Sequence, residues 1–425
     1  MTELKFPYGK EYITASFDDQ ELCGVLTSSI EEYEPCDSET ELVRKALENP
    51  EGSKKLSELA KGKNKIVVIA SDHTRPVPSK VIMPLMLGEI RKGNPDADIT
   101  ILIATGCHRG TTKDELVNKF GEEIVENEKI YIHDCADDSM LVNIGTLPSG
   151  GQCEINKLAA RADLLVAEGF IEPHFFAGFS GGRKSVLPGV AGRKTVLANH
   201  CSEFINSNNA RTGMLENNPI HNDMLWAAKK AGLCFVVNVV LNSEKKVVFA
   251  VAGDTEKAHK KGTDFLFSRC GAKGIEADIA ISTNGGYPLD QNVYQAVKGM
   301  TAAEATVKKG GVIIMLASSD DGTGGDYFYH LLADEENLQT VMDNILSKGR
   351  NETVPDQWEA QILTRILLHA TVIYVSEMDD EIVKNMHMIP AHSLDEAMDM
   401  ARKIVGKDKA KITAIPDGIS VMVVK

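Results

Sequence analysis

Three segments of this chain carry side chains that could move protons or hold a small anion. The first supplies Asp72 and Arg75, the second supplies His108, and the third supplies His174 and His200. Imidazole exchanges protons near neutral pH, and guanidinium forms bidentate pairs with carboxylate. These residue types suit acid–base chemistry on a carboxylate. The alternatives are structural histidines and a solvated arginine beside an Asp that caps the next helix.

The third segment, residues 168–200, has an unusual composition: EGFIEPHFFAGFSGGRKSVLPGVAGRKTVLANH. Its glycines let backbone N–H groups approach a ligand, and the basic pair Arg183–Lys184 could neutralise phosphate or carboxylate. The spacing matches neither G-x-x-x-x-G-K-[ST] nor G-x-G-x-x-G, which disfavours a P-loop nucleotidase. A glycine-rich surface loop is the alternative, but such loops rarely combine histidines with aromatic residues such as Phe175 and Phe176.

The three histidines His108, His174 and His200 could also be zinc ligands of a hydrolase. Zinc sites usually show compact spacing such as H-E-x-x-H, which this sequence lacks. The eight cysteines are scattered and form no C-x-x-C pair, which argues against a zinc ribbon or a disulfide scaffold. The spacing therefore disfavours a metal-dependent hydrolase.

The composition limits the partners and the location. With 46 Lys and Arg against 61 Asp and Glu, the formal charge of -15 disfavours nucleic acid and acidic membranes as partners. A fraction of 43% hydrophobic residues and 25% charged residues is typical of a globular protein. The first 17 residues lack the apolar core of a signal peptide, and no apolar run reaches the length of a membrane span. We expect a cytoplasmic protein with reduced cysteines.

Hydrophobic patterning predicts an α/β fold with largely parallel sheets. From Lys65 onward, short apolar runs alternate with amphipathic helices, which is typical of βαβ units. The carboxyl ends of parallel strands meet at one edge of a sheet, so the loops carrying Asp72, His108 and His174 should converge. The expected strands cover residues 66–70, 99–104, 130–133 and 164–167, and the expected helices cover residues 79–92 and 112–125.

The same alternation recurs after a short polar stretch at residues 271–276. We therefore expect an N-terminal α/β domain of residues 1–272 and a C-terminal α/β domain of residues 273–425, with their sheets facing each other across an active-site cleft. In the second domain, a helix at residues 292–308 would place Tyr294 and Lys298 on one face. An ordinary surface lysine is the alternative for Lys298.

Four motifs together resemble the nickel-dependent lactate racemase family. They are SDHTRPVPS, ATGCHR, FIEPHFFAGFSGGRKSVLPG with ANH ending at His200, and NGGYPLDQNVYQAVKGMTAAEA. Their order and spacing match the family along essentially the whole chain. The resemblance implies a nickel pincer nucleotide, pyridinium-3-thioamide-5-thiocarboxylic acid mononucleotide, covalently attached at Lys184. Nickel would be bound by one carbon and two sulfurs of this cofactor and by His200.

The resemblance also implies the other residue roles. His108 and His174 would be the catalytic acid/base pair, Arg75 and Lys298 would orient the substrate, and three further residues would line the site: Asp72 with the cofactor, and Tyr294 and Gln295 with the substrate. The implied activity is an isomerase reaction, the interconversion of D- and L-lactate or a closely related short 2-hydroxy acid. The implied partners are this small anionic substrate and the proteins that synthesise the cofactor.

The chemistry of the residues agrees with this activity. Inverting C2 of a 2-hydroxy acid requires removing hydrogen from a carbon of very low acidity and returning it to the other face. One route moves the hydroxyl proton to a histidine and hydride to the cofactor, through a 2-keto acid intermediate. Two histidines then serve the two positions of the hydroxyl. Two alternatives are a racemase or epimerase of larger or dicarboxylic 2-hydroxy acids, and a non-catalytic cofactor-binding protein.

Overall fold

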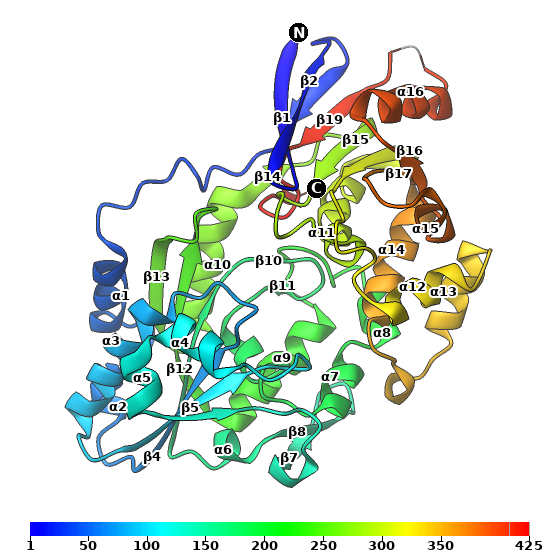
Figure 1. Cartoon of the computed structure of the whole chain (residues 1–425). Coiled ribbons are helices and arrows are strands. Elements are labelled where there is room, and N and C mark those ends of the chain that lie inside the picture. The colour runs from blue at the N-terminus through cyan, green and yellow to red at the C-terminus, as the bar shows by residue number, and fades with distance from the viewer. Residues whose placement is uncertain (408, 425) are drawn as a thin grey trace. The chain divides into compact units, whose positions relative to one another are not determined.

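The computed structural model describes residues 1–407 and 409–424, which form two compact units (Figure 1). The N-terminal unit comprises Ile30–His200 and Ser207–Ser268. The C-terminal unit comprises Met1–Ser29, Cys201–Asn206 and Arg269–Lys425. Each unit is built on a six-stranded sheet. The α/β fold class predicted from the sequence is confirmed.

The sheet of the N-terminal unit has the strand order β13-β12-β9-β4-β5-β6. All neighbours pair in parallel except β12 and β13, which are antiparallel because only residues 242–246 separate them, too few for a crossover. The strands are β4 (Lys65–Ser71), β5 (Asp98–Ala104), β6 (Lys129–Ile132), β9 (Leu164–Phe170), β12 (Leu233–Leu241) and β13 (Val247–Gly253).

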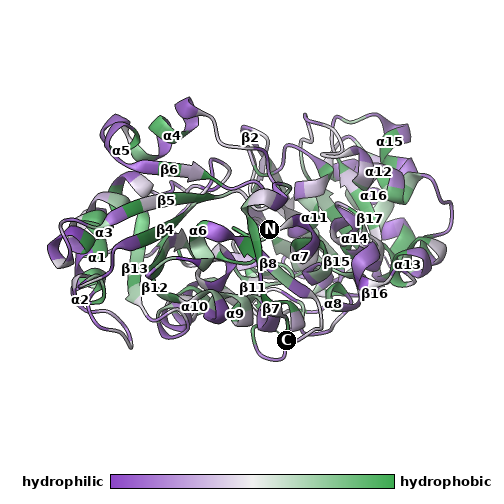
Figure 2. Cartoon of the chain, turned by 90° about the horizontal axis from the view of Figure 1, so that it is seen from below, coloured by the Kyte–Doolittle hydropathy of each residue, from purple (hydrophilic) through white to green (hydrophobic). Residues whose placement is uncertain are grey.

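Both faces of this sheet are covered, as expected for parallel strands. Ile66, Val68 and Ala70 of β4 share one hydrophobic core with α1 (Glu39–Glu48) and α3 (Ser79–Gly93). The alternate side chains of β4, Val67 and Ile69, are also buried. Figure 1 shows α1 and α3 beside each other over the sheet, and Figure 2 shows hydrophobic residues along the strands, whereas helices carry hydrophilic residues as well.

The predicted helix at residues 112–125 is two helices, α4 (Lys113–Phe120) and α5 (Glu122–Asn127). Thr112 begins α4 in a capping box with Glu115, and Gly121, at φ 88°, separates the two helices. A residue in this left-handed region ends a helix, and glycine adopts it without steric cost. Periodicity extended the prediction across the glycine, because the apolar pattern continues on its far side.

The C-terminal unit contains the sheet β18-β17-β16-β15-β19-β3, in which all five neighbouring pairs are parallel. The first strand of the chain to join it, β3, pairs with β19, and the preceding hairpin buries Phe6 and Phe17 in the same core. The predicted domain of residues 1–272 therefore differs from the N-terminal unit at residues 1–29, 201–206 and 269–272. The strands are β3 (Leu22–Val25), β15 (Ala277–Thr283), β16 (Val307–Leu316), β17 (Thr371–Val375), β18 (Ile389–Ala391) and β19 (Ile412–Ile415).

The remaining elements are shorter or cover the two sheets. The predicted helix at residues 292–308 ends earlier, because residues 307 and 308 already belong to β16. No helix in the described part of the chain is long and apolar enough to cross a membrane. These elements are β1 (Thr2–Tyr8), β2 (Glu11–Phe17), α2 (Leu56–Leu59), β7 (Leu141–Thr146), β8 (Gln152–Asn156), α6 (Lys157–Ala160), β10 (Pro173–His174), β11 (Gly178–Phe179), α7 (Arg193–Asn199), α8 (Ser202–Ile205), α9 (Pro219–Ala231), α10 (Lys257–Cys270), β14 (Gly271–Lys273), α11 (Val293–Glu304), α12 (Asp326–Ala333), α13 (Leu338–Leu346), α14 (Gln357–His369), α15 (Asp380–Asn385), α16 (Leu394–Val405) and β20 (Met422–Val424), with single 3-10 turns at Asp138–Met140, Gly182–Ser185 and Arg350–Glu352.

Each sheet has a point where the strand order reverses. In the N-terminal unit, β4 lies between β5, which follows it in the chain, and the later strand β9. In the C-terminal unit, β15 lies between β16 and β19. Ligands of open α/β sheets bind beyond the carboxyl ends of the strands at such points. The segments after β4, β9 and β15 are therefore the first places to look for a site.

Substitution of Gly299 tests how closely α11 approaches β15. A Cβ at this position would collide with the carbonyl oxygen of Thr283 and with the side chain of Met315. Overpacking of this kind typically costs ~1–3 kcal/mol. We expect Gly299→Ala to lower the free energy of unfolding by that amount in chemical denaturation.

Gly88 provides a matched control, because it lies in helix α3, is exposed and would place a Cβ in open space. Replacing a helical glycine by alanine there should raise stability by up to ~1 kcal/mol. Equal unfolding curves for Gly299→Ala and wild type would contradict the close approach.

Candidate active site

The loops after β4 and β5 bring Asp72 and His108 together. The two strands are parallel neighbours, and the distance from His108 Nδ1 to Asp72 Oδ2 is 2.7 Å. Thr74 holds the other carboxylate oxygen, because its hydroxyl and its backbone N–H donate to Asp72 Oδ1 at 2.6 and 3.1 Å. The predicted convergence of these two loops is thus observed.

The Asp72–His108 pair has a buried end and an exposed end. The Asp72 residue is 1% exposed, whereas the His108 side chain is 45% exposed. Burial favours the neutral form of Asp72, but the hydrogen bonds from His108 and Thr74 outweigh it, so the pKa of Asp72 lies below its ordinary value. The carboxylate can only accept, so Nδ1 of His108 is the donor and the Nε2 lone pair is left for a ligand or a proton.

His174 and His200 lie on either side of Phe176. The His174 ring is 4.5 Å from the Phe176 ring, centroid to centroid, and the His200 ring is 5.2 Å from it, both in edge contacts. Lys184 Nζ is 5.8 Å from the centroid of the same Phe176 ring. The segment identified from its composition therefore gathers two imidazoles and one ammonium around a single aromatic side chain.

His200 follows the last residue of α7 and is held in one orientation. Its Nδ1 is 2.9 Å from the carbonyl oxygen of Val196, so Nδ1 carries the hydrogen and Nε2 holds the lone pair. Burial, followed by the charge of Lys184, lowers the pKa of His200 to about 3. The imidazole is therefore neutral at working pH, which is the form that ligates a metal ion.

The turn that carries Lys184 is fixed by its neighbours in sequence. Gly181 and Gly182 adopt φ of 76° and 54°, and the N–H of Gly182 donates to Asn238 Oδ1 at 3.0 Å. The neighbouring Arg183 is 1% exposed and donates to the carbonyl oxygen of Ala177 at 2.7 Å. The basic pair Arg183–Lys184 therefore divides: Arg183 holds the turn, while the ammonium of Lys184 lies near Phe176.

A backbone hydrogen bond joins the two groups of residues. The N–H of Gly106, two residues before His108, donates to the carbonyl oxygen of Gly189 at 3.0 Å. Gly189 in turn donates its N–H to the carbonyl oxygen of Lys184 at 3.1 Å. The loop with the Asp72–His108 pair is thus tied to the turn with Lys184, and β4 and β9 are adjacent strands beneath them.

Arg75 is exposed at the same edge of the sheet. Two further residues at this edge, Lys119 and Glu168, were not among the predicted site residues. Lys119 of α4 donates from Nζ to the carbonyl oxygen of Arg75 at 3.2 Å, and burial lowers the pKa of Lys119. Glu168, at the end of β9, is fully buried, which raises its pKa, and its Oε1 accepts a hydrogen bond from the Ser79 hydroxyl. Lys119 gave no signal because helical periodicity does not reveal which lysine reaches a neighbouring loop.

The other three predicted residues belong to the C-terminal unit, on α11. Lys298 Nζ donates to Gln295 Oε1 at 2.6 Å, and Tyr294 Oη accepts from Trp358 Nε1 at 3.1 Å. Burial, followed by the charges of Glu359 and Asp356, raises the pKa of Tyr294 above its ordinary value. Tyr294 and Lys298 lie one turn apart on this helix, as predicted. The hydrogen bond between Trp358 and Tyr294 could not be predicted from the sequence.

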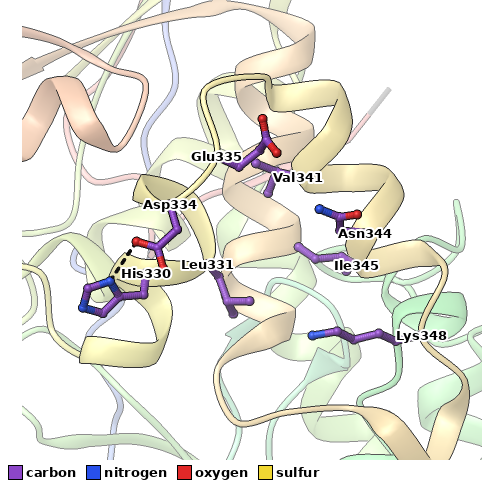
Figure 3. Close-up of a pocket in the computed structure, with 8 residues that line it drawn as sticks. All are labelled: His330, Leu331, Asp334, Glu335, Val341, Asn344, Ile345 and Lys348. Atoms are coloured by element: carbon purple, nitrogen blue, oxygen red, sulfur yellow. Dashed lines mark hydrogen bonds and ion pairs between the residues drawn. The ribbon is translucent and has the colours of Figure 1, made fainter.

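Two further features bear on metal and ligand binding. Within residues 1–407 and 409–424, no three His, Cys, Asp or Glu side chains are grouped so as to hold a metal ion. A pocket in the C-terminal unit lies between α12 and α13, and its lining includes none of the predicted site residues (Figure 3). It is lined by His330, Leu331, Asp334, Glu335, Val341, Asn344, Ile345 and Lys348.

The neutrality of His200 predicts a measurable acid sensitivity. Its pKa is about 3 in the folded protein and near the ordinary 6.5 when unfolded, so below pH 6.5 the unfolded chain binds a proton that the folded protein does not. This term therefore reduces stability as pH falls from about 6.5 towards 3. Between pH 7 and pH 5 we expect His200→Gln to lose about 2 kcal/mol less unfolding free energy than the wild type.

Two lysine variants test whether the charge of Lys184 contributes to the lowered pKa of His200, in the same unfolding measurement. Lys184→Met should weaken the acid sensitivity, because the second cause of the lowered pKa is removed. The exposed Lys194 serves as control, and Lys194→Met should leave the slope unchanged. Equal slopes for wild type and His200→Gln would show that His200 is not held neutral.

Comparison with known protein families gives matches to both parts of the chain. Residues 8–213 match the lactate racemase N-terminal domain, and residues 272–423 match the lactate racemase C-terminal domain. A lactate racemase of Thermoanaerobacterium thermosaccharolyticum is 56% identical over 424 residues, covering 100% of this chain and 99% of the relative. A lactate racemase of Lactiplantibacillus plantarum is 57% identical over 424 residues, with 100% of both chains covered.

Solved structures agree with these matches. The lactate racemase apoprotein from Thermoanaerobacterium thermosaccharolyticum superposes with a TM-score of 0.96 at 56% identity, with 100% of both chains covered. A crystal structure of a protein from Thermotoga maritima has a TM-score of 0.62 at 17% identity, covers 90% of this chain and 96% of that one, and shares the fold alone. By its sequence over the full length and by its fold, this chain belongs to the lactate racemase family.

Proposed function

We propose that this protein is an isomerase that interconverts D- and L-lactate. The observation that carries the proposal is the identity of 56–57% with two lactate racemases over essentially the full length of all three chains. The arrangement of the site supports it independently, because a carboxylate-held histidine, a second histidine and a neutral buried histidine lie on segments that share one sheet edge. The substrate is a small anion, lactate or a closely related short 2-hydroxy acid.

His108 is the better defined of the two proposed acid/base residues. With Nδ1 donating to Asp72, its Nε2 can accept the hydroxyl proton of the substrate, and the buried carboxylate stabilises the imidazolium that forms. Asp72 then acts as a positioning residue for His108. His174 serves the hydroxyl in its other position, since inversion at C2 places the hydroxyl on opposite sides before and after the reaction.

Members of this family use a nickel cofactor, and the residues of this chain fit one. Lys184 supplies an amine for covalent attachment. His200 supplies a neutral imidazole; because its Nδ1 donates to the carbonyl oxygen of Val196, Nε2 is the nitrogen that would ligate nickel. Both lie beside Phe176, so attachment and ligation would occur within one cluster. When bound there, a nickel pincer nucleotide would supply a reversible acceptor for the hydride of C2. Proteins that synthesise and load the cofactor are the partners this proposal requires.

The substrate carboxylate requires cations, because the chain as a whole carries a charge of -15. We assign this role to Arg75 and Lys298, with Tyr294 and Gln295 lining the substrate site. Gln295 accepts a hydrogen bond from Lys298, which restricts where the ammonium lies. The proposal includes a domain of residues 1–272 that carries the cofactor attachment and the catalytic histidines, and a domain of residues 273–425 that carries Tyr294, Gln295 and Lys298. It also includes a cytoplasmic location, which the eight free cysteines favour.

The attachment role of Lys184 can be tested without measuring turnover. Protein produced together with the cofactor-synthesis machinery should carry a mass adduct that peptide mapping places on Lys184, and bound nickel should be detected in equal amount. Lys184→Ala should lack the adduct and all racemase activity, since no other amine occupies that turn. Lys194→Ala, a change to an exposed lysine ten residues away, should retain both. Active wild-type protein with an unmodified Lys184 would refute the assignment.

The two histidines can be tested by substitution in the loaded enzyme. General acid–base catalysis typically contributes ~10²–10⁴-fold, so His108→Ala and His174→Ala should each lower kcat by that factor. Asp72→Asn should also lower kcat, because an amide cannot stabilise the His108 imidazolium as a carboxylate does. The exposed His392 offers a control remote in sequence. Chiral chromatography of lactate and a panel of larger 2-hydroxy acids measures each rate, and near-wild-type turnover in His108→Ala would sink its role.

A further inference from the structure

Glu359, on the first turn of α14, is a carboxyl group in an unusual environment. The residue is 0% exposed, and neither oxygen of its carboxyl group has a hydrogen-bond partner among the described residues. Burying an ionisable group without hydrogen bonds costs free energy, whereas burying an apolar side chain of similar size stabilises the fold. A methionine or a leucine would fill the same space, so packing alone does not explain an acid at this position.

The groups that act on Glu359 belong to the proposed substrate machinery. Helix α11 packs on α14, and the charge of its Lys298 favours ionisation of Glu359, while Asp356, the residue before α14, opposes it. Glu359 in turn raises the pKa of Tyr294 of α11. The charged side chains on the other helices packed against α14 are exposed: Asp326, Glu203, His330 and Asp343. Glu203 pairs with Arg350, His330 with Asp334, and Asp343 with Gln339.

The balance of these effects favours the neutral acid. Burial raises the pKa of Glu359 to about 8, with the opposing charge of Lys298 and the reinforcing charge of Asp356 as smaller causes. At neutral pH the carboxyl group is therefore mainly protonated. Above pH 8 it becomes an anion next to the Lys298 ammonium, in an environment of low dielectric constant where charges interact strongly.

We propose that Glu359 is a positioning residue that sets the charge Lys298 presents to an anionic substrate. In its neutral form it adds no negative charge beside Lys298, and the ammonium attracts the substrate carboxylate. In its ionised form it adds a buried anion that competes with the substrate for Lys298. This inference rests on the proposed role of Lys298 in substrate binding and adds to it a residue that touches neither substrate nor cofactor.

The decisive experiment compares the pH dependence of KM for lactate in wild type and Glu359→Gln. In the wild type, KM should rise above pH 8 by up to ~10-fold per pH unit, because only the neutral form leaves Lys298 to the substrate. In Glu359→Gln, which mimics the neutral acid, KM should stay flat over that range while kcat at pH 7 changes little. Glu359→Asp should restore a rise in KM.

Glu304 provides the matched control. It also lies on α11, is partly buried and is bound by Arg365 at 2.8 and 2.6 Å, so its removal tests whether loss of any nearby carboxylate changes the profile. Glu304→Gln should keep the wild-type rise in KM. A rise of the same size in Glu359→Gln as in wild type would overturn the proposal.

A second measurement separates this proposal from the function on which it rests. Infrared spectra of cofactor-free wild-type protein should contain the carbonyl band of a protonated carboxylic acid that titrates near pH 8 and is missing from Glu359→Gln. In Lys298→Met this titration should move to higher pH, because the charge that favours ionisation is removed. An unmoved titration, or no such band, would overturn the inference even if the protein racemises lactate. A protein that racemises no 2-hydroxy acid but shows both spectral effects would refute the proposed function alone.

Discussion

The parallel pairing of β4 with β5 on one side and with β9 on the other is the constraint on which the N-terminal site depends. It places the ends of three strands at one edge, where Asp72, His108 and the segment leading to Lys184 begin. Most side chains of these strands are buried, which constrains their register, because a shift by one residue would exchange the side chains that pack on the two faces of the sheet. The 2.7 Å bond between His108 and Asp72, two residues 36 positions apart in sequence, therefore depends on the pairing of β4 with β5.

Desolvation decides the protonation state of the residues that this framework positions. It is the largest cause acting on His200 and on Glu359, and in both it favours the neutral form, although one group is a base and the other an acid. Asp72 is the contrasting case, since two donors stabilise its charge at a buried position. Burial thus supplies a neutral imidazole and a neutral acid where hydrogen bonds are few, and an anion where donors converge.

Much of this arrangement could be predicted from the sequence. Apolar runs of four to six residues between helices predicted β4, β5, β6 and β9. Because the carboxyl ends of parallel strands meet at one edge of a sheet, the loops carrying Asp72 and His108 were then predicted to converge. The pairing of residues 1–29 with the C-terminal unit could not be predicted, because strand partners distant in sequence leave no periodic signal. The roles of Lys119 and Glu359 could not be predicted for a related reason. Their environment is created by segments distant in sequence, and sequence patterns predict that a Lys or Glu on a helix is exposed to solvent.

Charge at the site must also be considered together with attachment of the cofactor. Under the proposal, joining the Lys184 amine to a thioamide removes its positive charge, and with it the second cause of the low pKa of His200. Burial, the first cause, remains, and an added ligand would exclude further water, so the imidazole stays neutral and able to bind metal. Under the same proposal, Arg75 and Lys298 remain as the cations assigned to the substrate. If these proposals hold, the charge of Lys298 matters more in the loaded enzyme, and a neutral Glu359 leaves that charge available to the substrate.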